Sequence, residues 1–125
     1  MNKQKVIEAL KLHADFRSPN DKSFLYKIMS NKVVSKNLFE EIMDLIVSIK
    51  DEFSQENDNE LIKYIYSLTF WCRSWSSDGG FLSGTEDGNR LCKYAQILEE
   101  TLYYLLQDDK EEAFFLYNEY LDGRF

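Results

Sequence analysis

The stretch that decides the fold is LIKYIYSLTFWCRSW, residues 61–75. Its apolar residues are spread around a whole helix rather than along one stripe, and they are Leu61, Ile62, Ile65, Leu68, Phe70, Trp71, Cys72 and Trp75. The aromatic and β-branched residues would also suit a strand, but about fifteen residues without alternation favour a helix. Because apolar side chains occupy nearly every side, the pattern predicts a helix buried in the middle of the domain.

Upstream of this stretch, apolar residues at helical spacing predict helices over residues 3–14 and 36–53. Ser35 stands where the N-cap of the second of these helices belongs. The polar tract SQENDNE, residues 54–60, has no periodicity and is predicted to be a connector. The candidates for the cap of the next helix are Asn57, Asp58 and Asn59.

The only proline predicts a further helix start between these two helices. Ser18, Pro19 and Asp21 occupy the positions of an N-cap serine, a first-turn proline and a first-turn acid. Apolar residues follow at helical spacing up to Met29. The pattern therefore predicts a helix over residues 19–30.

Downstream, a glycine-rich segment separates the central stretch from two more helices, predicted over residues 88–107 and 110–121. Asp108 or Asp109 is expected to cap the last helix, and Gly123 stands where a C-terminal glycine stop belongs. The sequence thus predicts an all-α fold. We expect one domain over residues 1–125, a bundle of about six helices with a glycine-rich loop between helices four and five.

The chain of 125 residues has enough apolar material for one folded domain, since 44% of its residues are hydrophobic. Its net charge of −7 is unevenly distributed. Residues 1–37 carry eight basic and three acidic residues, a net +5, and residues 38–125 carry seven basic and nineteen acidic residues, a net −12. This balance argues against direct nucleic-acid binding. It leaves open whether the acidity serves solubility or attracts a basic partner.

Nothing in the sequence predicts secretion or insertion into a membrane. The first residues lack the continuous apolar run of a signal peptide, and no stretch approaches eighteen apolar residues. Cys72 and Cys92 are far apart within helical patterns, which favours free thiols over a disulfide. We therefore expect a cytoplasmic protein without a membrane partner.

The segment SSDGGFLSGTEDG, residues 76–88, matches neither of two glycine-rich functional loops. Gly79 and Gly84 have the spacing of a phosphate-binding loop, but Thr85 stands where that loop requires lysine. Alternate oxygen ligands of a calcium loop are also missing. The acids Asp78, Glu86 and Asp87 could hold a cation between them, but solvated loop acids are the commoner case. We expect no metal and no cofactor.

No catalytic signature surrounds the nucleophiles or the single histidine, His13, so we do not expect an enzyme. Glu40 and Asp44 share a helix face, where like charges repel unless a partner or a nearby base relieves them. A second acidic group consists of Asp108, Asp109, Glu111 and Glu112. It is interpreted either as a helix N-terminus that favours acids or as an acidic docking patch.

The aromatic residues next to the glycine segment are candidate anchors for a protein partner. Trp71 is expected in the core, whereas Trp75 and Phe81 lie closer to the loop, among charged residues. Binding hot spots favour aromatic residues surrounded by polar ones. The predicted partner-binding residues are Trp75, Asp78, Phe81, Glu86, Asp87, Asp108, Asp109, Glu111 and Glu112.

In overall character, a small acidic helical domain with an aromatic-centred loop among acids resembles the immunity proteins of bacterial toxin systems, including those of contact-dependent growth inhibition. The resemblance spans the chain loosely and transfers no residue. It implies that the protein binds a cognate toxin domain, often a basic nuclease, and blocks its active site. The alternative is a structural or regulatory helical protein that forms a homodimer through its aromatic surplus. An enzyme that acts through Asp78, Glu86 or Asp87 ranks third.

Overall fold

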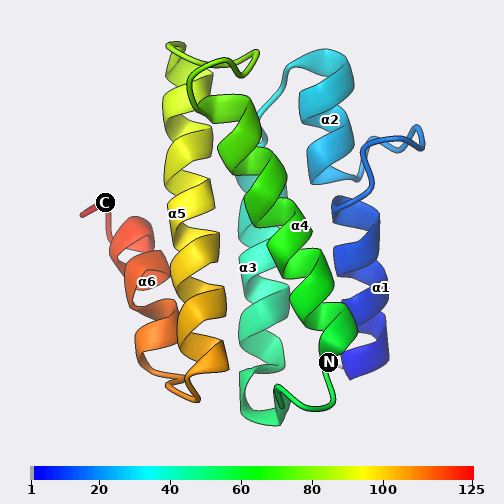
Figure 1. Ribbon diagram of the computed structural model, residues 1–125, viewed down its shortest axis with the longest axis vertical. Helices are drawn as coiled ribbons and strands as arrows, with labels where there is room; N and C mark the ends of the chain where they lie inside the picture. Colours follow the sequence, from blue (N-terminus) through cyan, green and yellow to red (C-terminus); the bar gives the residue numbers. More distant parts are fainter. Residues whose placement is uncertain (1) are drawn as a thin grey trace.

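In the computed structural model, which describes residues 2–125, the chain forms six α-helices and two short 3₁₀ helices (Figure 1). These are α1 (Lys3–His13), α2 (Phe24–Asn31), α3 (Lys36–Ser48), η1 (Lys50–Glu52), α4 (Asn59–Ser76), α5 (Glu86–Leu106), η2 (Glu112–Phe114) and α6 (Phe115–Leu121). The prediction of an all-α bundle of about six helices is confirmed. The glycine-rich segment joins α4 to α5.

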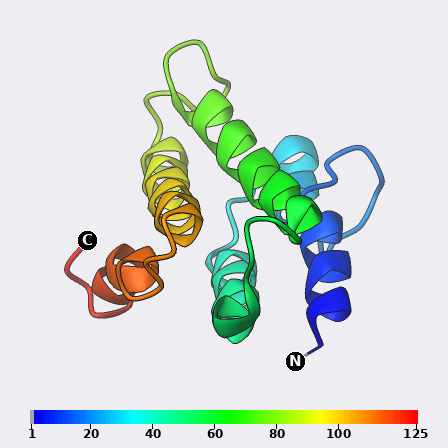
Figure 2. The same cartoon turned by 60° about the horizontal axis from the view of Figure 1, so that its bottom comes forward.

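The helices form two layers around one core. The long helices α4 and α5 pack along each other, and α6, α3 and α1 lie side by side beneath them (Figure 2). The short helix α2 lies at the end of the bundle where the α4–α5 loop turns (Figure 1). The central position of α3 leaves its inner face buried and its outer face open between α1 and α6.

Stacked aromatic rings join α3 to α5 and α6 in the core. The rings of Phe39 and Tyr94 are nearly parallel, with centroids 3.9 Å apart. Tyr117 and Tyr120 of α6 meet Phe39 edge to face at 6.3 and 5.8 Å. Edge-to-face and offset aromatic pairs stabilise a core beyond the area that they bury. The last helix is therefore held against α3, and this contact places both tyrosine hydroxyls at the edge of the outer face.

The predicted helix start at Pro19 is wrong, because α2 begins five residues later, at Phe24. The carboxylate of Asp15 accepts hydrogen bonds from the amides two and three residues on, and the side chain of Asn20 accepts one from the amide two residues on. These local bonds stabilise turns in place of a helix. Ser23 is the actual N-cap, and its hydroxyl accepts a bond from the amide three residues on.

Two other helix ends differ from the prediction. The helix predicted over residues 36–53 ends at Ser48, and η1 follows it. The helix predicted over residues 110–121 begins with η2 and becomes α-helical only at Phe115. Asp58 occupies the N-cap position of α4, but its side chain caps nothing there. Its buried carboxylate instead accepts a hydrogen bond from the amide of Ser54 at 2.7 Å and pairs with Lys3 at 3.1 Å.

The prediction that the 61–75 helix is buried on nearly every side is also wrong. Tyr66 is 59% exposed and Phe70 is 45% exposed on the outer face of α4. The inner face, which carries Leu61, Ile65 and Leu68, is fully buried. The helix therefore has one face in the core and a second apolar face that no other part of residues 2–125 covers.

Candidate partner-binding surfaces

The glycine segment forms the turn between α4 and α5. Gly79 and Gly84 have φ values of +90° and +77°, which residues with a Cβ rarely adopt. The amide of Leu82 donates to the carbonyl of Trp75 at 3.0 Å, so the loop folds back on the end of α4. A Cβ at Gly88 would overlap the carbonyl oxygen of Leu82. These glycines therefore have conformational reasons to be present.

Trp75 lies under the loop, and the prediction that it is an exposed anchor is wrong. It is only 6% exposed, with its ring 5.6 Å from that of Phe16 and 5.4 Å from that of Phe81. Phe81 is partly exposed, and the ammonium of Lys32 lies 4.3 Å from its ring centroid. Phe81 thus packs over Trp75, and part of the Phe81 side chain is exposed to solvent. Its role in partner binding stays a prediction.

The loop acids are not gathered into one site. Asp78 is exposed, and Glu86 and Asp87 stand in the first turn of α5, where acids favour the helix dipole. Asp87 pairs with Arg90 at 3.0 Å. Within residues 2–125, no group of three or more histidine, cysteine or acidic side chains is arranged to hold a metal ion.

The second predicted acidic group lies at the other end of α5. Its four residues are exposed, and the carboxylate of Asp109 accepts a hydrogen bond from the amide of Glu112 at 3.2 Å. Asp108 has a φ of +63° at the turn after α5. At a rise of 1.5 Å per residue, Glu86 and Leu106 are separated by about 30 Å along the helix. The predicted acids thus form two separate groups and not one continuous surface.

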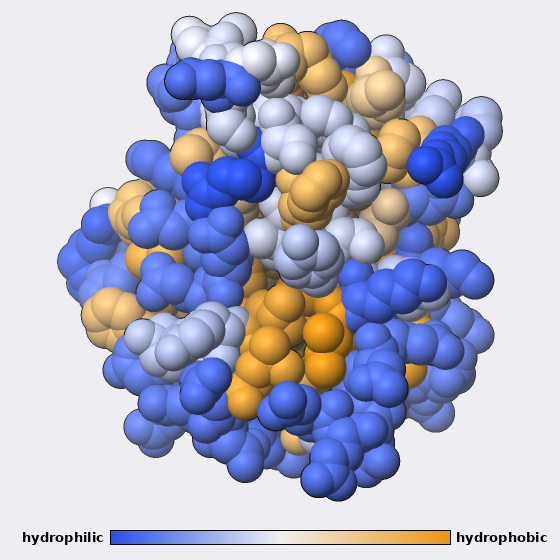
Figure 3. Space-filling view, viewed as in Figure 1, coloured by the Kyte–Doolittle hydropathy of each residue, from blue (hydrophilic) through white to orange (hydrophobic). Residues whose placement is uncertain are grey.

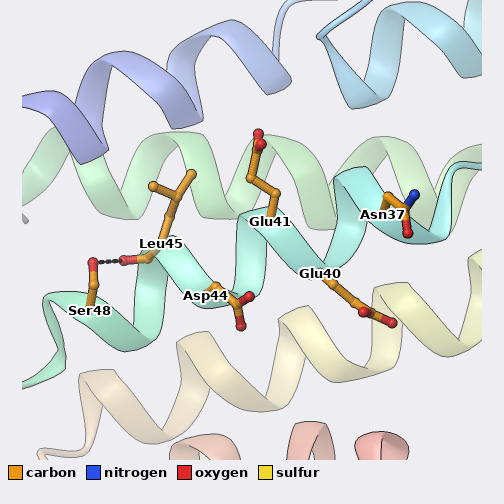
Figure 4. Close-up of a pocket in the computed structure, with 6 residues that line it drawn as sticks. All are labelled: Asn37, Glu40, Glu41, Asp44, Leu45 and Ser48. Carbon is orange, nitrogen blue, oxygen red and sulfur yellow. Dashed lines mark hydrogen bonds between the residues drawn. The ribbon is translucent and has the colours of Figure 1, made fainter.

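A third acidic group, which sequence reasoning did not select as a site, lies on the outer face of α3. Glu40, Glu41 and Asp44 line a hollow of about 430 Å³, named here the α3 hollow (Figure 4). Its other lining residues are Asn37, Leu45 and Ser48. Figure 4 shows Glu41 directed toward α1, and Glu40 and Asp44 directed toward the opposite side, where α5 and α6 lie.

Neutral donors hold all three carboxylates of the α3 hollow. Tyr120 donates to Glu40 at 2.9 Å and Tyr117 donates to Asp44 at 3.1 Å. Burial and the neighbouring carboxylates raise the pKa of Tyr117, and burial with its hydrogen bonds raises that of Tyr120. Both phenols therefore stay protonated as donors. Lys36 lies 3.6 Å from Glu40, but no ion pair within residues 2–125 involves Asp44.

The third donor is His13, which is fully buried beneath α3. Its Nδ1 accepts a hydrogen bond from the amide of Phe24 at 3.2 Å, so the ring proton is on Nε2, which lies 2.5 Å from a carboxylate oxygen of Glu41. Burial lowers the pKa of His13, and Glu41 only partly opposes this effect. The hydroxyl of Ser23 donates to backbone carbonyls and not to the ring. Both ring nitrogens are therefore engaged in holding the fold.

An apolar groove lies on the opposite face of the molecule, between α4 and α5. This α4–α5 groove has a volume of about 360 Å³. Its lining residues are Tyr66, Thr69, Phe70, Arg73, Ser74, Glu99, Leu102, Tyr103 and Leu106. Figure 3 shows a hollowed apolar area between these two helices, bordered by hydrophilic residues. α3 lies behind α4 and α5 in Figure 1, so the groove and the α3 hollow open in opposite directions.

An ion pair borders one end of the groove. Arg73 and Glu99 form a two-bond contact, with Nε–Oε1 and Nη2–Oε2 distances of 2.9 and 2.8 Å. At the other end, Leu106 is shared with a polar hollow that includes Glu56 and Asp108. The groove is thus bordered by an ion pair at one end and, next to Leu106, by a polar hollow that contains two acids.

No protein-family model, no curated protein and no solved structure matches the chain. None of the helices in the described part of the chain combines the length and apolar content needed to cross a lipid bilayer.

Proposed function

We propose that the protein is a non-catalytic binding module that neutralises a basic protein, as an immunity protein does with a toxin domain. The observation that supports this proposal is the α3 hollow, where Glu40, Glu41 and Asp44 share one solvent-open site and each accepts from a neutral donor. Neutral donors fix the positions of the carboxylates without cancelling their charge, and of the three only Glu40 is also paired with a lysine, Lys36, at 3.6 Å. The hollow is thus preorganised for cationic side chains.

The geometry suits the guanidinium groups of a basic protein surface. Glu40 and Asp44 are one helical turn apart on the same side of α3, and Glu41 faces the other wall of the hollow. An arginine that enters the hollow would relieve the repulsion among the three acids and form charge-assisted hydrogen bonds. In a nuclease, such arginines are the ones that contact phosphate, so their occupation would block substrate.

The test compares two variants with the same change in net charge. Glu40→Gln/Asp44→Asn keeps both tyrosine hydrogen bonds and removes two charges from the hollow. Glu111→Gln/Glu112→Gln removes two exposed charges elsewhere. Each protein is used as bait in a lysate of the source cells at low salt, the retained proteins are identified by mass spectrometry, and the Kd of the recovered partner is measured against salt.

We expect a basic partner whose affinity falls as salt rises, since exposed charges are screened. The hollow variant should bind it at least tenfold more weakly, with a smaller salt slope, and the control variant should bind like the wild type. If the partner is a toxin, its expression alone arrests growth, and only co-expression of the wild type or the control restores it. Loss of binding in the control variant alone would place the site at the C-terminal acids. Binding indifferent to salt and to both variants would refute the proposal.

A further inference from the structure

We infer that the α4–α5 groove is a second docking surface, which takes an amphipathic helix of a partner protein with basic residues at one end. This inference is independent of the proposed function of the α3 hollow, because the two surfaces face in opposite directions. A domain with this arrangement can hold one partner on each face.

The shape of the groove matches a docked helix. On α4 its lining residues recur at Tyr66, Phe70 and Ser74, and on α5 at Glu99, Tyr103 and Leu106, which is one stripe along each helix. The stretch from Tyr66 to Ser74 measures about 12 Å along α4. Two neighbouring stripes of this kind form a trough for about two turns of a third helix, the helix-in-groove mode of recognition.

The walls of the groove are aromatic and its floor is aliphatic. Tyr66, Phe70 and Tyr103 are all exposed to about half of their surface, while Leu102 lies nearly buried between them. Three large exposed aromatic side chains that line a single hollow are typical of a binding site, whereas single exposed apolar residues are common on any protein. Leucine or similar side chains at i, i+3, i+4 and i+7 of a partner helix would fill it.

The charge at the two ends fixes the chemistry and the direction of the partner helix. At one end, Arg73 and Glu99 satisfy each other. Glu56 and Asp108 are exposed near the other end, next to Leu106, and neither forms an ion pair within residues 2–125. Lysine or arginine residues of the partner should therefore lie at the end next to Leu106, where they meet two carboxylates without a counter-charge.

The same charges disfavour two other occupants. A second copy of the chain would bring a further net charge of −7 into contact with the first, and an anionic membrane surface would also be repelled. A basic amphipathic helix has the opposite charge and the complementary apolar face. It is therefore the occupant that both the acidic charge and the apolar lining of the groove favour.

The experiment uses a designed probe, an 18-residue peptide with leucine at helical spacing and lysines clustered at one end. It is titrated into the isotope-labelled full chain, and amide chemical shifts are followed by NMR. A peptide of the same composition in scrambled order is the ligand control. Phe70→Ser/Tyr103→Ser alters the groove walls, and Phe115→Ser alters an equally exposed aromatic residue on α6.

We expect shifts confined to the groove, no binding of the scrambled peptide, and an affinity at least tenfold lower for Phe70→Ser/Tyr103→Ser but unchanged for Phe115→Ser. A spin label at the lysine end of the probe should broaden signals near Glu56 and Asp108. The variant Glu56→Gln/Asp108→Asn, which needs no change in the groove walls, should weaken binding severalfold and reduce its salt dependence. It tests the inference even if the wall variant does not fold.

Three results would overturn the inference. The first is equal loss of affinity in Phe70→Ser/Tyr103→Ser and Phe115→Ser. The second is a set of shifts centred on the α3 hollow, or a loss of peptide binding in Glu40→Gln/Asp44→Asn. The third is a dimer in sedimentation velocity that Phe70→Ser/Tyr103→Ser dissociates, which would make a second copy the occupant. Because Glu40→Gln/Asp44→Asn leaves the groove intact, failure of the α3 proposal and failure of this one are distinguishable.

Discussion

The replacement of His13 by leucine tests the hydrogen-bond assignment beneath α3. Leucine has a similar volume but cannot accept a bond from the amide of Phe24, which lies in the interior. An unpaired buried amide costs about 1–3 kcal/mol. The bond to Glu41, whose side chain is 57% exposed, adds at most about 1 kcal/mol. We therefore expect His13→Leu to lower the free energy of unfolding by about 1–4 kcal/mol at pH 7.5.

The same variant should change the dependence of stability on pH. Burial lowers the pKa of folded His13 below its ordinary value of 6.5, so the unfolded chain binds a proton there before the folded chain does. Stability contributed by neutral His13 is therefore present above pH 6.5 and is lost as the pH falls toward the folded pKa. Between pH 6.5 and 5.0 this loss reaches at most about 2 kcal/mol, because one pH unit corresponds to about 1.4 kcal/mol.

The assay is urea unfolding of the wild type, His13→Leu and His13→Asn at pH 7.5 and 5.0. His13 is the only histidine, so the difference in pH dependence between wild type and variant belongs to this residue. His13→Leu should lose less stability than the wild type on acidification, which narrows the gap between them. Asparagine can still accept from Phe24 and should be the milder change at pH 7.5. Equal stability of His13→Leu and wild type at pH 7.5, or parallel pH profiles, would refute the assignment of the two nitrogens.

Three further perturbations test the packing. Gly88→Ala should lower the free energy of unfolding by about 1–3 kcal/mol, because the alanine Cβ would overlap the carbonyl oxygen of Leu82. Alanine normally stabilises a helix, so thermal melts that show a stabilised variant would contradict this overlap. Asp58→Ala should cost about 1–3 kcal/mol in urea titrations, since it leaves a backbone amide of the connector without its acceptor, and an unchanged midpoint would count against that bond. A thiol reagent should modify Cys92 in the native state and Cys72 only after unfolding. Cys72 is fully buried, and burial raises the pKa of its thiol. Fast reaction of both thiols in the native state would disprove this burial.

The helices that were predicted well are those whose signals are local. Ser35 caps α3 by accepting from the amide of Leu38 at 3.1 Å, as its position in the sequence suggested. Apolar spacing also placed α1, α4 and α5 to within about two residues at each end. Caps and periodicity act over one or two turns, and a single sequence contains that information.

The start of α2 was misplaced because two local signals competed. Around Pro19 a serine, a proline and an acid stand at the positions of a helix start. In the structure, however, the side chains of Asp15 and Asn20 accept hydrogen bonds from nearby amides, and these bonds stabilise turns instead of a helix. Ser23 then caps the helix and also donates to the carbonyl of Asp15 at 2.8 Å. That second bond connects residues eight positions apart, and Ser23 rather than Ser18 is the cap.

Only the acids of the α3 hollow, and not their hydrogen-bond donors, could be predicted from the sequence. The spacing of Glu40 and Asp44 indicated a like-charge pair in need of relief. The structure supplies a nearby base, Lys36, for Glu40 and a tyrosine hydroxyl for each of the two carboxylates. Those donors, Tyr120 and Tyr117, are 80 and 73 residues away along the chain. Their positions depend on how α6 packs on α3, which no local pattern contains.

The outer face of α4 shows which sequence signal separates a helix that is buried on every side from one with an exposed apolar face. Aromatic residues on every side led to the interpretation of full burial, yet Lys63, Ser67 and Ser74 fall on the same stripe as Tyr66 and Phe70. A buried stripe would not place lysine and two serines at this spacing, because unpaired polar groups are costly in a core. Periodicity locates the stripe, and its polar members indicate a helix face that is exposed to water rather than buried in the core.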